Sequence, residues 1–156
     1  MKLRIVAVGS KMPGWVESGY AEYARRMPPE LRLELVEIPL APRRKGETPG
    51  RALQLETTAI LKAVPERHRM ILLDVAGKGW STAQLAQNLA AWQASGDSLC
   101  FVIGGPDGVD ATCSDRADEC WSLSPLILPH PLVRIVLAEQ LYRAWSINAS
   151  HPYHRG

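Results

Sequence analysis

Two unbroken apolar runs constrain the fold of this chain more than any other feature. The segments MILLDV, residues 70–75, and LCFVI, residues 99–103, contain almost no polar side chain. A strand has this composition when both of its faces are covered, as in the centre of a parallel sheet with helices on each side. The two runs therefore predict a fold built around a buried parallel sheet.

Further strand and helix patterns alternate along the chain. LRIVAV, residues 3–8, predicts another buried strand, and CWSL, residues 120–123, a brief one. LRLELVEI, residues 31–38, alternates apolar and charged residues, which is typical of a strand near a sheet edge. Because helical patterns separate these strands, we predict an α/β fold with a mostly parallel sheet flanked by helices. At 156 residues, the chain is expected to form a single domain, 1–156.

The helical segments show which sides should face the core. For the helix around 52–63, the expected buried residues are Ala52, Leu55, Ala59, Ile60 and Ala63. For the long helix after residue 130, they are Val133, Val136, Leu137, Leu141, Ala144 and Trp145. Glu139 and Arg143 lie one turn apart on the other side of that helix, so they can form an ion pair.

Composition excludes some classes of protein. Hydrophobic residues make up 46% of the chain and the formal net charge is only +2, which is ordinary for a globular protein. The three cysteines form no CxxC pair, as expected in a reducing cytoplasm. No apolar run is long enough to cross a bilayer. We therefore expect a cytoplasmic protein that does not span a membrane.

Three loops should follow the carboxyl ends of strands, where open parallel sheets bind ligands. They are DVAGKGWS after Leu73, GGPDG after Ile103 and SPLILPHP after Leu123. Adjacent glycines let a backbone approach a ligand closely, and prolines stiffen a loop. Together the loops predict a rigid pocket lined by backbone, although GGPDG alone is equally consistent with a tight turn that binds nothing.

Familiar site motifs are missing. GGPDG lacks the spacing of a dinucleotide-binding loop, AGKGWS departs from the P-loop pattern, and no GxSxG nucleophile motif occurs. His151 and His154 have a spacing that metal ligands sometimes show, but structural zinc normally has two such pairs. We therefore expect no metal site.

The chain ends in HPYHRG, an unusually reactive composition for a terminus. From residue 130 onward, one acid, Glu139, accompanies the basic and aromatic residues His130, Arg134, Tyr142, Arg143, His151, Tyr153, His154 and Arg155. Positive charge interleaved with aromatic rings suits phosphate binding and base stacking. A solvated helix face with a loose tail is the competing interpretation.

Five segments carry a resemblance to a known family: MKLRIVAVGSKMPGWV, LLDVAGKGWST, FVIGGPDG, WSLSPLILPHPLVRIVLAEQLYRAWSI and HPYHR. Together they resemble the ribosomal RNA large-subunit methyltransferase H family, small bacterial enzymes of the SPOUT (α/β-knot) superfamily. The resemblance implies S-adenosylmethionine-dependent methylation of N3 of a pseudouridine in 23S rRNA, on the assembled ribosome. It also implies a homodimer with each active site at the subunit interface and a C-terminal trefoil knot, which ordinary topology rules do not favour.

Site residues follow from the same resemblance. The methyl donor is expected to contact Leu73, Gly104, Gly105, Leu123, Ser124, Pro125, Leu126, Ile127 and Leu128, largely through backbone groups. A base must remove the N3 proton, for which His154 is the first candidate and His130 the second. Arg143 or Arg155 could stabilise charge on the ring, and Tyr153 could stack on an unpaired base. We expect the tail to become ordered only against a partner subunit or RNA.

Two other function classes compete with the methyltransferase hypothesis. One is a non-catalytic RNA- or ribosome-binding protein that uses the basic C-terminus without a cofactor. The other is a small-nucleotide enzyme that uses the glycine loops without RNA. The loop around 41–49 matches the family poorly, and its basic cluster, Arg43 to Lys45, is expected to be solvated rather than bound to RNA.

Overall fold

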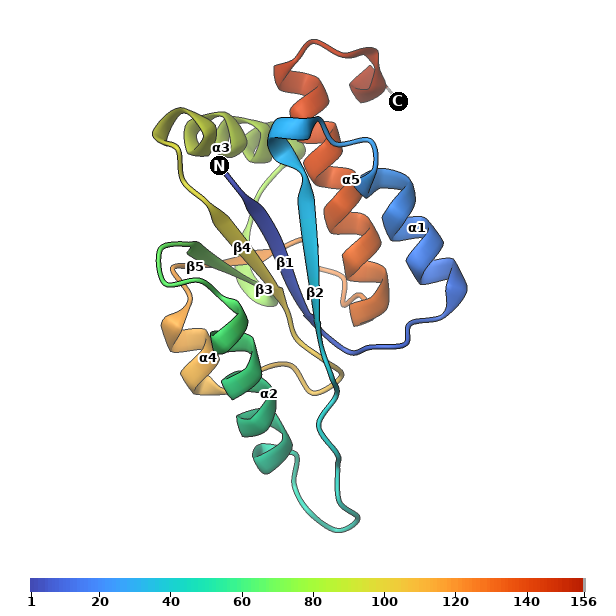
Figure 1. The fold of residues 1–156 in the computed structure, drawn as a ribbon, viewed down its shortest axis with the longest axis vertical. Helices are drawn as coiled ribbons and strands as arrows, with labels where there is room; N and C mark the ends of the chain where they lie inside the picture. The colour runs from blue at the N-terminus through green and yellow to red at the C-terminus, as the bar shows by residue number, and fades with distance from the viewer. Residues whose placement is uncertain (156) are drawn as a thin grey trace.

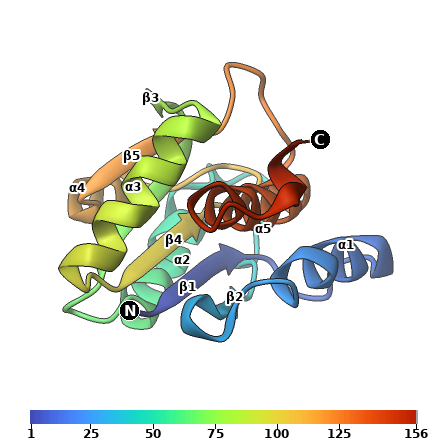
Figure 2. The ribbon, with the colours of Figure 1, turned by 90° about the horizontal axis from the view of Figure 1, so that it is seen from above.

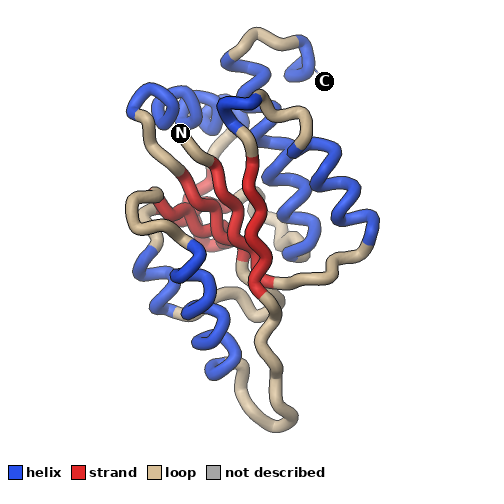
Figure 3. The backbone as a smooth tube through the Cα atoms, in the orientation of Figure 1, coloured by secondary structure: helices blue, strands red, loops and turns tan. Residues whose placement is uncertain are grey.

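The computed structural model describes residues 1–155, which form one five-stranded sheet in the order β2-β1-β4-β3-β5 (Figures 1 and 3). The strands are β1 Leu3–Val8, β2 Leu33–Ile38, β3 Arg69–Gly79, β4 Leu99–Ile103 and β5 Glu119–Ser122. All neighbouring strands run parallel, so their carboxyl ends meet at one edge. The predicted α/β class is confirmed, and β2 is an edge strand as expected.

Helices cover both faces of this sheet. They are α1 Gly14–Ala24, α2 Gly50–Ala63, α3 Thr82–Ser95, α4 Ala111–Arg116 and α5 His130–Asn148, with short 3-10 turns η1 Pro29–Leu31 and η2 Pro152–Arg155. Helix α5 packs between α1 and α3 on one face, as Figure 2 shows from above. Helices α2 and α4 pack together on the other face.

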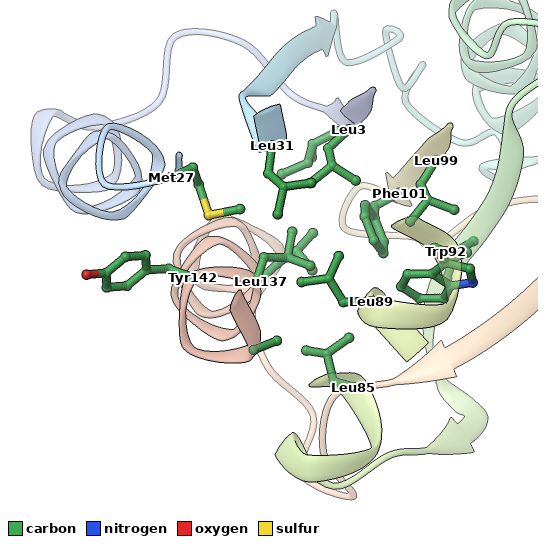
Figure 4. Close-up of a cluster of buried hydrophobic side chains, with 14 of the residues drawn as sticks. Leu3, Met27, Leu31, Leu85, Leu89, Trp92, Leu99, Phe101, Leu137 and Tyr142 are labelled. Atoms are coloured by element: carbon green, nitrogen blue, oxygen red, sulfur yellow. The ribbon is translucent and has the colours of Figure 1, made fainter. Parts of the chain in front are cut away.

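The buried core is divided by the sheet into two clusters. Leu3 and Phe101 point toward α3 and α5, where they meet Leu89 and Leu137 (Figure 4). The strand residues that point to the opposite face of the sheet pack with Ile60 of α2. Because every residue of β4 is buried, the unbroken apolar run is explained by coverage on both faces. Truncating Phe101 to alanine is expected to cost about 3–5 kcal/mol of unfolding free energy.

Strand β3 is longer than its sequence predicted. The apolar run predicts a strand over residues 70–75 followed by a loop, but β3 runs from Arg69 to Gly79. Its pairing with β5 shifts between Leu73 and Lys78, both of which lie opposite Trp121. The extra residues form a bulge in which the Asp74 carboxylate accepts the Ala76 N–H at 2.9 Å. The bulge depends on pairing with a distant strand, so local composition could not indicate it.

Two helices bury residues that were not predicted, although Ala52 and Ile60 of α2 and Leu137, Leu141 and Ala144 of α5 are buried as predicted. In α2, Leu55 is 53% exposed whereas Glu56 is 2% exposed. Glu56 is tolerated inside because its carboxylate accepts the Ala41 N–H and pairs with Arg43. In α5, the buried side includes Arg134 and Tyr142, while Val133, Val136 and Trp145 are half-buried.

Within residues 1–155, no helix is both long and apolar enough to cross a membrane. The trefoil knot implied by the resemblance is a matter of how the chain threads its own loops, and it stays a prediction.

Candidate functional site

A pocket of about 550 Å³ lies at the carboxyl ends of the strands. Three segments line it: the β3 bulge, the loop after β4, and the loop from β5 to α5. The predicted donor-binding residues among its lining are Leu73, Gly104, Gly105, Leu123, Ser124, Leu126, Ile127 and Leu128, whereas Pro125 is not part of it. This volume is in the range that small-molecule sites occupy, about 300–1,000 Å³.

The GGPDG loop forms a compact turn against the pocket. The Gly108 N–H donates to the Gly105 carbonyl at 3.0 Å. A Cβ on Gly104 would lie 3.0 Å from the Gly108 carbonyl carbon and oxygen, so a side chain there would push the turn open. Close packing within the turn therefore explains its glycines. The turn also presents backbone groups to the pocket.

The loop from β5 to α5 is ordered by its own serines. The Ser122 hydroxyl donates to the Ser124 carbonyl at 2.9 Å, and the Leu126 N–H donates to the Ser124 hydroxyl at 3.0 Å. Leu126 and Ile127 are 73% and 85% exposed. The chain therefore holds two large apolar side chains in water beside the pocket, an arrangement that usually marks a contact surface.

His130, the second candidate base, begins α5 and lines the pocket. Burial, and then the neighbouring Arg134, lower its pKa below the ordinary 6.5. Its Nδ1 is buried and has no hydrogen-bond partner among residues 1–155. His130 is therefore neutral at pH 7 and can accept a proton.

Composition groups Arg134 with the basic C-terminus, but in the structure it is buried, which corrects that expectation. Its side chain is 1% exposed, donating to the Gly9 carbonyl at 2.7 Å and to Glu37 at 2.6 Å. The arginine thus fastens α5 to the ends of β1 and β2 and is not available to RNA. Its helical spacing from Leu137 and Leu141 indicated the buried face, but its charge pointed to the surface.

The remaining predicted residues gather at the other end of α5. The Tyr153 hydroxyl donates to Glu139 at 2.8 Å, and Arg143 pairs with Glu139 at 3.0 Å, as predicted for that pair. The Arg143 guanidinium also lies 4.9 Å from the centre of the Tyr153 ring. Burial, followed by the bond to Glu139, raises the pKa of Tyr153 to about 12, so its hydroxyl stays protonated at neutral pH.

The tail is folded back on its own chain, contrary to the expectation that it needs a partner for order. Residues Pro152–Arg155 form η2 against α5, with the Tyr153 ring 4.6 Å from that of Tyr142. His154 is half-buried and Arg155 is exposed. This contact is made across the turn that follows α5, and composition alone does not reveal it.

The pocket and this C-terminal cluster lie apart along α5, because the cluster contacts the helix from Glu139 onward, about 14 Å or more beyond His130. The helix has 19 residues and is therefore about 28 Å long. Figure 1 shows it beginning at the carboxyl edge of the sheet and ending near the opposite edge, beside the chain's C-terminus. Within one chain, His130 lines the pocket, whereas Arg143, Tyr153, His154 and Arg155 do not.

No group of three or more histidine, cysteine or acidic side chains is positioned to hold a metal ion in the part of the chain that the structure describes. A parallel sheet with a backbone-lined pocket at its strand ends defines an α/β protein that binds a small ligand.

Comparisons with known proteins assign the family. The family model described as predicted SPOUT methyltransferase matches residues 1–154, so the chain belongs to the SPOUT methyltransferase family. It is 50% identical to the ribosomal RNA large subunit methyltransferase H of Marinomonas sp. (strain MWYL1), over 99% of this chain and 100% of that protein. Identity is also 50% to the protein of the same name from Hahella chejuensis (strain KCTC 2396), over 99% of each chain.

A solved structure supports the fold independently. A probable methylase family protein from Haemophilus influenzae Rd KW20 superimposes with a TM-score of 0.58 at 12% identity, covering 97% of this chain and 69% of that one. At this identity the likeness concerns the fold alone.

Proposed function

We propose that this chain transfers a methyl group from S-adenosylmethionine to N3 of a pseudouridine in 23S rRNA, acting on the assembled ribosome in the cytoplasm. The observation that carries the proposal is the full-length similarity to two proteins named ribosomal RNA large subunit methyltransferase H. Methyltransferases of this family use S-adenosylmethionine as the donor. The whole of 1–156 is proposed to act as one domain.

The pocket fits such a donor. Its size suits a nucleoside-sized ligand, and the loops around Gly104 and Ser124 present backbone groups together with apolar side chains. Residues Leu73, Gly104, Gly105, 123–124 and 126–128 are proposed to hold the donor. When bound, it would supply an electrophilic methyl group.

The active site is proposed to be shared between two copies of the chain. The C-terminal cluster contacts α5 from Glu139 onward, about 14 Å or more along the helix from His130, and none of its residues lines the pocket of its own chain. A two-fold homodimer with antiparallel α5 helices would bring each tail to the other pocket. The exposed Leu126 and Ile127 beside the pocket give such a dimer apolar surface to cover.

Proton removal is the main chemical task of the side chains. The N3 of a uracil-like ring becomes nucleophilic once deprotonated, and a positioned base contributes about 10²- to 10⁴-fold. His154 of the partner subunit remains the first candidate base, and His130, neutral and inside the pocket, the second. Arg143 is proposed to stabilise charge on the ring, while Tyr153 and Arg155 contact the RNA.

The test uses ribosomes from a strain that lacks the modification. Incubation with S-adenosylmethionine labelled in the methyl group should label one position of 23S rRNA, and ribosomes already modified should take up no label. A protein that binds the donor by calorimetry but labels neither kind of ribosome would contradict the proposal.

A further inference from the structure

The segment 41–49, between β2 and α2, has no role in the proposed active site. We call it the basic arm. Figure 1 shows it extending past the carboxyl edge of the sheet. Its tip is an ordered turn in which the Glu47 N–H donates to the Arg44 carbonyl at 3.1 Å. Gly46 supplies the positive φ of 82° that this turn needs. The turn places Arg44 and Lys45 side by side in solvent.

The base of the arm is clamped by Arg43. Its guanidinium pairs with the buried carboxylate of Glu56 and donates to Asp107 at 3.0 Å. Glu56 also accepts the Ala41 N–H at 3.0 Å. The carboxylates of Glu56 and Asp107 raise the pKa of Arg43 above its ordinary value. The expectation of a wholly solvated cluster is therefore wrong for Arg43, which connects the arm to the body of the protein.

The clamp also fixes where the arm stands relative to the pocket. Asp107 belongs to the GGPDG turn, between Pro106 and Gly108, which both line the pocket. The arm is thus tied directly to the wall of the proposed donor site. The arm therefore stands beside the site at which a nucleotide would be methylated.

The two cations at the tip are not neutralised. Among residues 1–155, no acidic group lies within 4.0 Å of the charged atoms of Arg44 or Lys45, and Glu47 is the one acid in the turn. Exposed, ordered and unpaired cations beside a site for an anionic polymer suit contacts with phosphate oxygens, which position a nucleic acid without reading its sequence.

We propose that the basic arm is an rRNA-docking surface, in which Arg44 and Lys45 bind backbone phosphates next to the nucleotide being methylated. This inference rests on the proposed function, since it names the surface by which the same site receives its RNA. Each phosphate contact releases counterions and steepens the salt dependence of binding by about 0.7–0.9 in a plot of log affinity against log salt.

The experiment measures binding of the full-length protein to 70S ribosomes by sedimentation, between about 50 and 200 mM salt. The variant is Arg44→Gln with Lys45→Gln. The matched control, Lys62→Gln with Arg67→Gln, removes the same charge from exposed positions at and beyond the far end of α2. Donor affinity is measured separately by calorimetry with S-adenosylmethionine.

The arm variant should bind ribosomes about tenfold more weakly, with a salt slope reduced by about 1 to 2, while its donor affinity is unchanged. The control should keep the slope of the unmodified protein. An unchanged slope in the arm variant, an equal reduction in the control, or a loss of donor affinity would each overturn the docking role.

Binding and methyl transfer are read separately, so the two proposals can fail separately. If the unmodified protein binds ribosomes without methylating them, the proposed function fails, and the slope still decides the role of the arm. If it does not bind ribosomes at all, both proposals are overturned.

Discussion

The two ends of α5 are built on different principles. At its beginning, His130 lies in a pocket formed by stiff loops, and the buried Arg134 anchors the helix to the sheet. Along its second half, Tyr153, Arg143 and Glu139 form a cluster of rings and charges on the surface. The first end suits a small ligand held by shape and backbone, and the second suits a charged, planar partner.

Because of this difference, donor binding and the RNA half of the reaction can be tested by separate variants. A change at the beginning of α5 should affect donor binding, and a change at its end should affect the RNA half of the reaction. Variants at the two ends should therefore separate two quantities that a single-chain active site would change together.

The largest effect is expected from deleting residues 152–156. Loss of Tyr153, His154 and Arg155 should lower kcat/KM for ribosomes by about 10²- to 10⁴-fold, because base and RNA contacts disappear together. Donor affinity, measured by calorimetry, should stay within about threefold of the full chain, a difference of under 1 kcal/mol. Equal loss of both quantities, or of neither, would count against a substrate-side role for the tail.

The two histidines sharpen the comparison. If His154 is the base, His154→Gln should lower kcat by about 10²-fold or more, and His130→Gln by less. If His130 is the base, the order reverses. Because the pKa of folded His130 lies below 6.5, it is neutral above that pH, and activity that depends on it should fall only as the pH drops below about 6.5. A pH profile of each variant shows which histidine controls that fall.

A smaller effect is expected from Gly104→Ala at the pocket end. The added Cβ would lie 3.0 Å from the Gly108 backbone, so the turn must shift. Donor affinity should fall about tenfold, or about 1.4 kcal/mol, while ribosome binding is unchanged. Gly14→Ala is the matched control, because a Cβ there meets nothing within 4 Å. Similar donor affinities for the two variants would show that the turn does not shape the pocket.

Much of the fold could be predicted from local sequence. The apolar runs of β3 and β4 indicated coverage on both faces, and the strand-end loops indicated a pocket. The β3 bulge and the burial of Glu56 could not be foreseen, because each depends on a partner distant in sequence. Arg134 lies in the apolar stripe of α5, but its charge predicted a position on the surface.

The sequence indicates both sets of site residues but not the distance between them. His130 begins α5, whereas Tyr153 packs against its second half at Glu139 and Tyr142, so about 14 Å or more of helix separates them. Composition groups residues by chemistry, whereas a helix separates them by about 1.5 Å per residue. A site shared between two chains reconciles the common chemistry of these residues with their separation along the helix.

The most direct test of that arrangement mixes two inactive proteins. One lacks residues 152–156, and the other carries Gly104→Trp, which pushes the GGPDG turn open at Gly108 and so disrupts the donor pocket. After subunit exchange in equal amounts, half of the dimers are mixed, and each mixed dimer has one site with an intact pocket and an intact tail. Ribosome methylation should therefore return to about a quarter of the unmodified level. If the mixture stays inactive although mixed dimers have formed, the pocket and the tail do not act together across the interface.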